Sequence, residues 1–105
     1  MTGFGRILDD LNGAGIRYVL IGGIALIRHG VVRAHGDLDL LSEKAAAVGF
    51  TELLDRADTR RVDGIEAPIC SLADLVAMKR SVGRERDRVD LADLESAHGD
   101  LPDSP

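Results

Sequence analysis

The stretch RYVLIGGIALIRHGVVRAHGDLDLL, residues 17–41, carries the most informative structural signals of this chain. Tyr18 to Ile21 is a continuous apolar run rich in β-branched residues, which predicts a strand buried on both faces. Gly22 and Gly23 break that strand and open a short helix, and Gly30 ends the helix. A second strand follows, so the stretch predicts a strand–helix–strand unit.

The second strand carries Asp37 and Asp39 within an apolar run. In a strand these two side chains point to one side, and Leu38 and Leu40 point to the other. Aspartate is disfavoured in strands, so the pair needs a reason. One reason is metal binding, because hard divalent cations such as Mg²⁺ prefer carboxylate oxygens. The other is that both are solvated residues at a strand edge. The residues alone favour neither metal binding nor simple solvation.

Gly22 and Gly23 gain significance from their position. A glycine turn that opens a helix presents free backbone N–H groups to an anion, although strand-to-helix turns use glycine routinely. Here the turn precedes Asp37 by one helix, so phosphates bound at the turn would lie at the end of the sheet where the aspartates project.

Composition indicates one small domain. The chain has 105 residues, of which 45% are hydrophobic and only 3% aromatic, so the core must be built from aliphatic side chains. We expect the domain to span residues 1–97 and residues 98–105 to form a flexible tail. One cysteine, Cys70, excludes an internal disulfide and suits a reducing compartment. With no run of ~18 apolar residues and no secretory signal, we expect a cytoplasmic protein without membrane contact.

The net charge of −5 argues against a globally basic nucleic-acid binder. It leaves nucleic acid open as a substrate, because a local group of arginines gathers near one predicted helix junction: Arg80, Arg84, Arg86 and Arg88.

The rest of the chain predicts a small mixed sheet with helices packed mainly on one face, an α/β (α+β) fold. Asp63-Gly64 indicates the turn of a hairpin over 61–69, and Ser71 with Asp74 is a helix-start signature. We expect three or four strands. Helical patterns cover 4–11, 43–57 with an interruption near Gly49, a segment that starts at Ser71, and 85–97.

Lys79 lies beside the apolar stripe of the helix that starts at Ser71, and Asp87 and Asp90 lie at the edge of the stripe of the next helix. A Lys79–Asp90 or Lys79–Asp87 ion pair would satisfy these groups without any catalysis. Alternatively, Lys79 could contact a triphosphate as a point charge. The residues leave both readings open.

The order GG, helix, HG, spacer and D-x-D resembles the signature of the nucleotidyltransferase (DNA polymerase β-like) superfamily. Within it the chain is most similar to the AbiEii-type toxins, because SLADLVAMKRSVGRERDRVDLADLE, residues 71–95, resembles their lysine helix and following K-D-x-x-D-L run. The resemblance covers roughly 17–41 and 50–95. It implies a minimal nucleotidyltransferase-like fold and a toxin–antitoxin context with an antitoxin-like protein partner.

The resemblance also implies an activity: Mg²⁺-dependent transfer of a nucleoside monophosphate from an NTP to an RNA or protein hydroxyl. On this reading Gly22, Gly23, Arg33 and Lys79 bind the nucleotide. Asp37 and Asp39 hold the metal, and these two aspartates with Lys79 form the catalytic set.

The chain departs from the family pattern where a third carboxylate is expected. Two-metal chemistry clamps the attacking and leaving oxygens, and relatives carry a third acid on another strand. Between Leu41 and Phe50 there are only SEKAAAVG, too few for a helix and a strand, which need ~20 residues. Asp63 and Glu66 are the remaining candidates, and Asp63 already has a turn role.

Three functions therefore remain open: a weak enzyme, a degenerate nucleotide-binding or regulatory remnant, and a small partner-binding structural domain. A strand edge exposed by the shortening could be covered in a homodimer.

Overall fold

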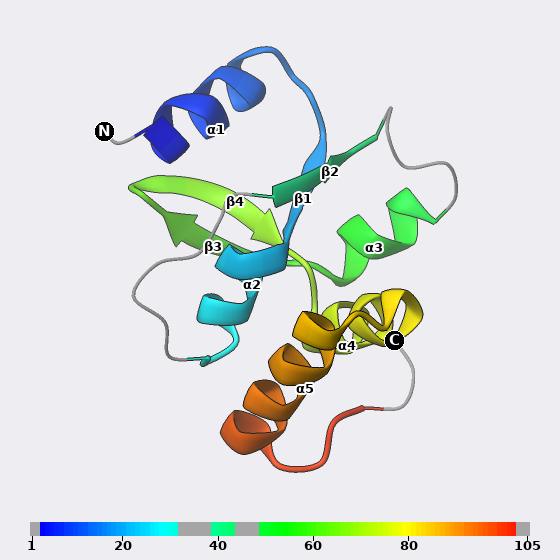
Figure 1. The fold of residues 1–105 in the computed structure, drawn as a ribbon. Helices are drawn as coiled ribbons and strands as arrows, with labels where there is room; N and C mark the ends of the chain where they lie inside the picture. Colours follow the sequence, from blue (N-terminus) through cyan, green and yellow to red (C-terminus); the bar gives the residue numbers. More distant parts are fainter. Residues whose placement is uncertain (1–2, 32–38, 44–48, 103–105) are drawn as a thin grey trace.

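The computed structural model describes residues 3–31, 39–43 and 49–102. Figure 1 shows helices gathered around a small sheet. The elements are α1 (Gly3–Gly13), β1 (Tyr18–Ile21), α2 (Gly22–Arg28), β2 (Asp39–Ser42), α3 (Phe50–Arg56), β3 (Asp58–Val62), β4 (Ile65–Ile69), α4 (Leu72–Val82) and α5 (Glu85–His98).

The sheet has the strand order β2-β1-β4-β3. β1 is antiparallel to β2 and parallel to β4, and β4 forms an antiparallel hairpin with β3. The sheet is therefore mixed, and the expected α+β class with four strands is confirmed for the described chain. The hairpin turn at Asp63-Gly64 is confirmed as well.

Pro68 explains why the parallel contact between β1 and β4 is short. The backbone N–H of Cys70 donates to the carbonyl of Leu20 at 3.0 Å. Donors that face the same neighbour recur every second residue along a strand, so position 68 would supply the preceding bond to β1. Proline has no N–H to donate, and the parallel register is limited to the pair Leu20–Ile69.

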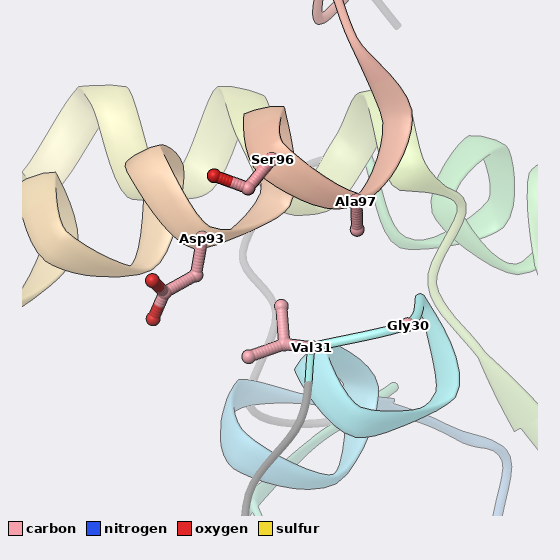
Figure 2. Close-up of a pocket in the computed structure, with 5 residues that line it drawn as sticks. All are labelled: Gly30, Val31, Asp93, Ser96 and Ala97. Atoms are coloured by element: carbon pink, nitrogen blue, oxygen red, sulfur yellow. The ribbon is translucent and has the colours of Figure 1, made fainter.

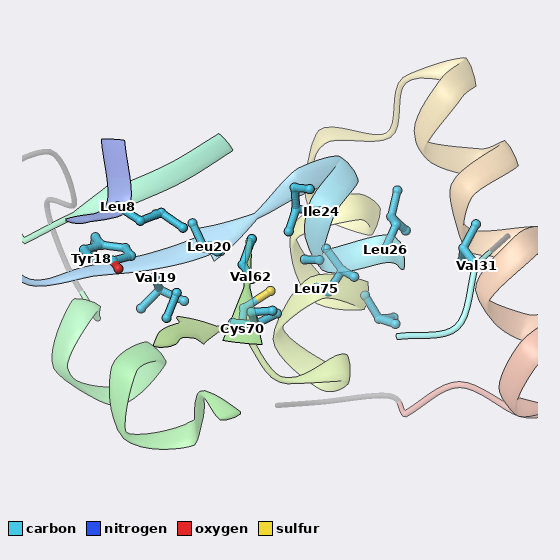
Figure 3. Close-up of a cluster of buried hydrophobic side chains, with 14 of the residues drawn as sticks. Leu8, Tyr18, Val19, Leu20, Ile24, Leu26, Val31, Val62, Cys70 and Leu75 are labelled. Carbon is cyan, nitrogen blue, oxygen red and sulfur yellow. The ribbon is translucent and has the colours of Figure 1, made fainter. Parts of the chain in front are cut away.

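At β1, helices contact the sheet from both of its faces. The hydroxyl of Tyr18 bonds to Asn12 of α1 at 3.0 Å, whereas the guanidinium of the preceding Arg17 lies 6.0 Å from the ring centroid of Phe50 in α3. Figure 3 shows Leu8 of α1 on one side of β1 and Val19 pointing to the other side, towards α3. Because neighbouring strand residues point to opposite faces of a sheet, α1 and α3 lie on opposite faces at β1.

The N-terminus of α4 is held by a polar cluster that only part of the sequence signal revealed. Ser71 caps the helix as expected, since its Oγ accepts a bond from the backbone N–H of Asp74 at 3.1 Å. The buried Asp74 carboxylate also receives two bonds from Arg56 of α3, at 2.9 and 2.8 Å. This bidentate pair ties the end of α3 to the start of α4.

The last described residues turn back along the molecule (Figure 1). His98 is the last residue of α5, Leu101 packs against the core, and Arg80 donates to the carbonyl of Pro102 at 3.1 Å. The proposed domain boundary after residue 97 stays a prediction. None of the described helices is long and apolar enough to cross a membrane.

Cys70 is fully buried in the core, and burial raises the pKa of its thiol to about 12. The thiolate is the reactive form, so we expect Ellman's reagent at pH 8 to label the native protein no faster than the protein unfolds. Full and rapid labelling in guanidinium chloride is the control. Rapid stoichiometric labelling of the native protein would contradict the burial of Cys70.

Candidate functional site

Three elements meet at one end of the sheet. β1 ends at Ile21 and leads directly into α2 at Gly22, while Asp39 begins β2 opposite Ile21. The parallel strand β4 ends on the same side and leads into α4. In open sheets this region, beyond the carboxyl ends of parallel strands, is where ligands bind.

A groove of about 300 Å³ lies there. It brings together Gly22, Asp39 and Lys79, three residues that the sequence singled out separately. The full lining is Ile21, Gly22, Asp39, Leu41, Leu75, Met78, Lys79, Ser81, Val82, Arg84 and Asp87.

Gly22 is required at its position by two constraints. Its φ of +72° is a left-handed conformation that favours glycine. A Cβ added at Gly22 would also lie 3.0 Å from the Cβ and 3.4 Å from Oδ2 of Asp39. The backbone at the start of α2 therefore lies directly against the Asp39 side chain. Gly23 follows as the second residue of α2, and it is not among the residues that line the groove.

Asp39 presents its carboxylate to the groove in the way the alternation predicts. Asp39 and Leu41 both line the groove, whereas Leu40 between them packs against the core. The exposed Asp39 has no ion pair or hydrogen bond to its side chain within the described chain. It is therefore available to a ligand.

The donor set suits a shared cation rather than a complete metal cage. Among the described residues, no group of three or more His, Cys, Asp or Glu side chains could hold a metal. Mg²⁺ commonly takes one or two carboxylates together with substrate phosphates. Asp39 fits this requirement, and Asp37, the second expected ligand, lies outside the described residues, as does Arg33.

Lys79 makes the ion pairs that the sequence offered as a structural alternative. Its Nζ lies 2.9 Å from Oδ2 of Asp90 and 3.3 Å from Oδ1 of Asp87. The Lys79 side chain is only 12% exposed, and those of Asp87 and Asp90 are 1% and 8% exposed. The cluster joins α4 to α5 while the lysine still lines the groove.

Asp87 also belongs to the capping box of α5, in which Arg84 is the N-cap residue. Its Oδ2 accepts bonds from the backbone N–H of Arg84 at 3.1 Å and from the Arg84 Nε at 2.9 Å. The Arg84 side-chain bond, with the Arg84 backbone N–H and Lys79 also contributing, holds the pKa of Asp87 well below its usual range. Asp87 is therefore ionised throughout the physiological range.

The two candidates for a third carboxylate do not lie near Asp39. Asp63 is in the β3–β4 turn, at the start of β4 and thus at the opposite end of the sheet from the groove. Its Oδ2 accepts the backbone N–H of Gly5 at 2.9 Å, and its φ is +54°. Glu66, near the same end of β4, lies 4.0 Å from Arg61 in an exposed pair. Both have structural roles.

The sequence analysis did not identify the apolar half of the groove or the hydroxyl of Ser81. Met78 and Val82 continue the stripe of Leu75 and Lys79 at helical spacing, so the sequence carried a signal for them that was not used. Ser81 lies off that stripe and gave no signal. Arg84 was noted only as part of a basic cluster.

A second cavity, of about 310 Å³, lies between the end of α2 and α5. Figure 2 shows Ala97 pointing towards Gly30 and the polar ends of Asp93 and Ser96 on the α5 side. None of the described residues predicted to bind nucleotide or metal lines it. The lining is Gly30, Val31, Asp93, Ser96 and Ala97.

Comparison of the chain with protein-family models, with curated proteins and with solved structures finds no match.

Replacing Gly22 by alanine tests the close approach to Asp39. We expect Gly22→Ala to lower the free energy of unfolding by more than the ~1–2 kcal/mol that a left-handed backbone costs a non-glycine residue. The matched control is Gly49→Ala, because Gly49 has a φ of +80° with nothing within 4 Å of an added Cβ. Equal losses in the two variants, measured by urea unfolding, would contradict the contact.

The lowered pKa of Asp87 predicts an acid-sensitive stability. A carboxylate with a depressed folded-state pKa contributes stability that is complete above the unfolded value of about 4 and is lost as the pH falls towards the folded-state pKa. Asp87→Asn should therefore flatten the fall in unfolding free energy between pH 5 and pH 3. The exposed Asp9→Asn in α1 is the control, and an unchanged slope for Asp87→Asn would refute the assignment.

Proposed function

We propose that this protein binds an NTP with Mg²⁺ in the groove at the end of the sheet and is a nucleotidyltransferase-like protein with weak turnover. The proposed reaction is attack of an RNA or protein hydroxyl on the α-phosphorus. A new P–O bond forms there, the bond from the α-phosphorus to the bridging oxygen breaks, pyrophosphate leaves, and the proton of the attacking hydroxyl passes to solvent water.

The convergence of Gly22, Asp39 and Lys79 on one groove is the observation that supports this proposal. They come from α2, β2 and α4, far apart in the sequence, and each was selected on different grounds. A glycine turn, a free carboxylate and a lysine are the groups needed for a metal-bound phosphate chain. The resemblance to the nucleotidyltransferase superfamily, including the AbiEii-type toxins, points to the same function.

In this proposal each residue has a distinct task. Asp39, together with Asp37, would hold Mg²⁺, which when bound neutralises phosphate charge. Gly22 lets the phosphate chain approach the backbone closely. The resemblance also assigns Gly23 and Arg33 to the nucleotide site, although Gly23 does not line the groove and Arg33 lies outside the described residues. Lys79 supplies positive charge, although it shares that charge with Asp87 and Asp90.

A degenerate nucleotide-binding remnant is the second candidate, and two observations favour it. The Lys79 ammonium is already paired with two carboxylates. Neither Asp63 nor Glu66 lies near Asp39, and Asp87, the other described carboxylate that lines the groove, is paired with Lys79 and Arg84. Both observations lower the expected rate without preventing binding.

Calorimetry with Mg²⁺ and each NTP tests nucleotide binding, which both the weak enzyme and the degenerate remnant require. We expect weak Mg²⁺-dependent binding by the natural chain and a loss of about tenfold in affinity for Asp39→Asn, since an interaction with a charged group is removed. Asp37→Asn/Asp39→Asn should bind less still. Asp9→Asn in α1 is the matched control and should bind like the natural chain.

Absence of NTP binding, or binding that ignores the double change, would leave a structural, partner-binding domain as the remaining function. If binding is found, transfer of labelled NMP to total RNA and to protein separates the enzyme from the remnant.

The other parts of the proposal concern context. A cytoplasmic location, an antitoxin-like partner and a homodimer formed through an exposed strand edge remain predictions. The described sheet supports the last one, because β2 and β3 each pair on one edge only within the described chain.

A further inference from the structure

We propose that Ser81 is the residue by which the groove discriminates among nucleobases, and that the base lies against the apolar wall formed by Leu41, Met78 and Val82. This inference rests on the proposed NTP binding. It identifies which part of the groove takes which part of the nucleotide.

The lining of the groove divides by chemistry into two parts. Gly22, Asp39 and Lys79 are the phosphate and metal groups of the proposed function. Leu41, Met78 and Val82 form an apolar surface, on which Val82 is 59% exposed. Ligand sites are usually apolar surfaces with a few polar groups that set orientation, and the faces of a nucleobase are apolar planes that match such a surface.

The geometry of α4 places the two parts on different sides. Lys79 reaches Asp87 and Asp90, so its side of the helix faces α5. Ser81 is two residues on and therefore lies ~160° away around the helix axis, with Met78 between them on the groove side. A ligand whose charged end lies at Lys79 thus extends its other end over Met78 towards Ser81.

Ser81 is the only uncharged side chain in the described lining with a strong hydrogen-bonding group. It is exposed, and no hydrogen bond or ion pair engages it within the described chain. A hydroxyl can both donate and accept, so it can pair with an exocyclic amino group or a carbonyl on a base edge. One neutral hydrogen bond changes affinity by about two- to tenfold, which sets the scale of discrimination expected.

The test compares the affinities of ATP, GTP, CTP, UTP and inorganic tripolyphosphate, each with Mg²⁺, for the natural chain and for Ser81→Ala. We expect a modest preference among the four nucleotides, reduced about two- to tenfold by Ser81→Ala, with tripolyphosphate binding unchanged. Met78→Ala should weaken all four nucleotides and spare tripolyphosphate. Ser96→Ala, the same chemical change in the second cavity, is the matched control.

The outcomes separate this inference from the function on which it rests. Nucleotide binding with the same preference in Ser81→Ala, or with no preference in the natural chain, overturns the role of Ser81 and leaves the proposed function standing. Equal losses of nucleotide and tripolyphosphate in Ser81→Ala also overturn it, since the effect would then not involve the base. Failure of the natural chain to bind any of the five probes overturns the proposed function itself.

Discussion

The pairing of β1 with strands on both of its edges is the constraint on which the described structure depends. Leu20, fully buried at the centre of β1, is paired with Leu40 on one side and with Ile69 on the other. β2 reaches the rest of the sheet only through β1, and the β3–β4 hairpin is joined to β2 only through it. β2 runs antiparallel to β1, whereas β4 runs parallel to β1. The start of β2 therefore lies at the same end of the sheet as the ends of β1 and β4. The groove is a consequence of this pairing.

The charged cluster between α4 and α5 then closes one side of the groove. Among the described residues, two cations, Lys79 and Arg84, are paired with the carboxylates of Asp87 and Asp90. Removing charges from water is costly unless they are paired and hydrogen-bonded, and here both carboxylates receive such bonds. The cluster therefore has a complete structural explanation. Its presence alone is weak evidence for catalysis, and Gly22 and Asp39 must support the functional reading.

Residues close together in the sequence predicted the helices, strands and turns well. The contacts between segments far apart in the sequence were predicted poorly. The turn at Asp63-Gly64 and the cap at Ser71 depend on residues next to each other in the chain, and both are confirmed. The strand order β2-β1-β4-β3 depends on contacts between distant segments, which periodicity does not encode. The same limit applies to Arg56, whose bonds to Asp74 no sequence spacing indicated. For Lys79 the sequence indicated two possible ion-pair partners, Asp87 and Asp90, and two possible roles, structural pairing and contact with a triphosphate. The structure shows that both partners are used at once, which spacing alone left open because either aspartate could have pointed away.

The groove separates what is needed for binding from what is needed for turnover. In the proposed function, binding of a metal-bound phosphate chain requires a carboxylate, a close backbone and a positive charge, which Asp39, Gly22 and Lys79 would supply. Two-metal transfer further requires carboxylates that grip a second ion on the side of the attacking oxygen. In the described chain β2 has a partner strand only on its β1 side, so no adjoining strand carries an acid next to Asp39 on the other. The lysine that would face the phosphates is at the same time held by two carboxylates. A phosphate ligand bound as proposed would have to compete with Asp87 and Asp90 for the charge of Lys79, and that competition would weaken both binding and transition-state stabilisation.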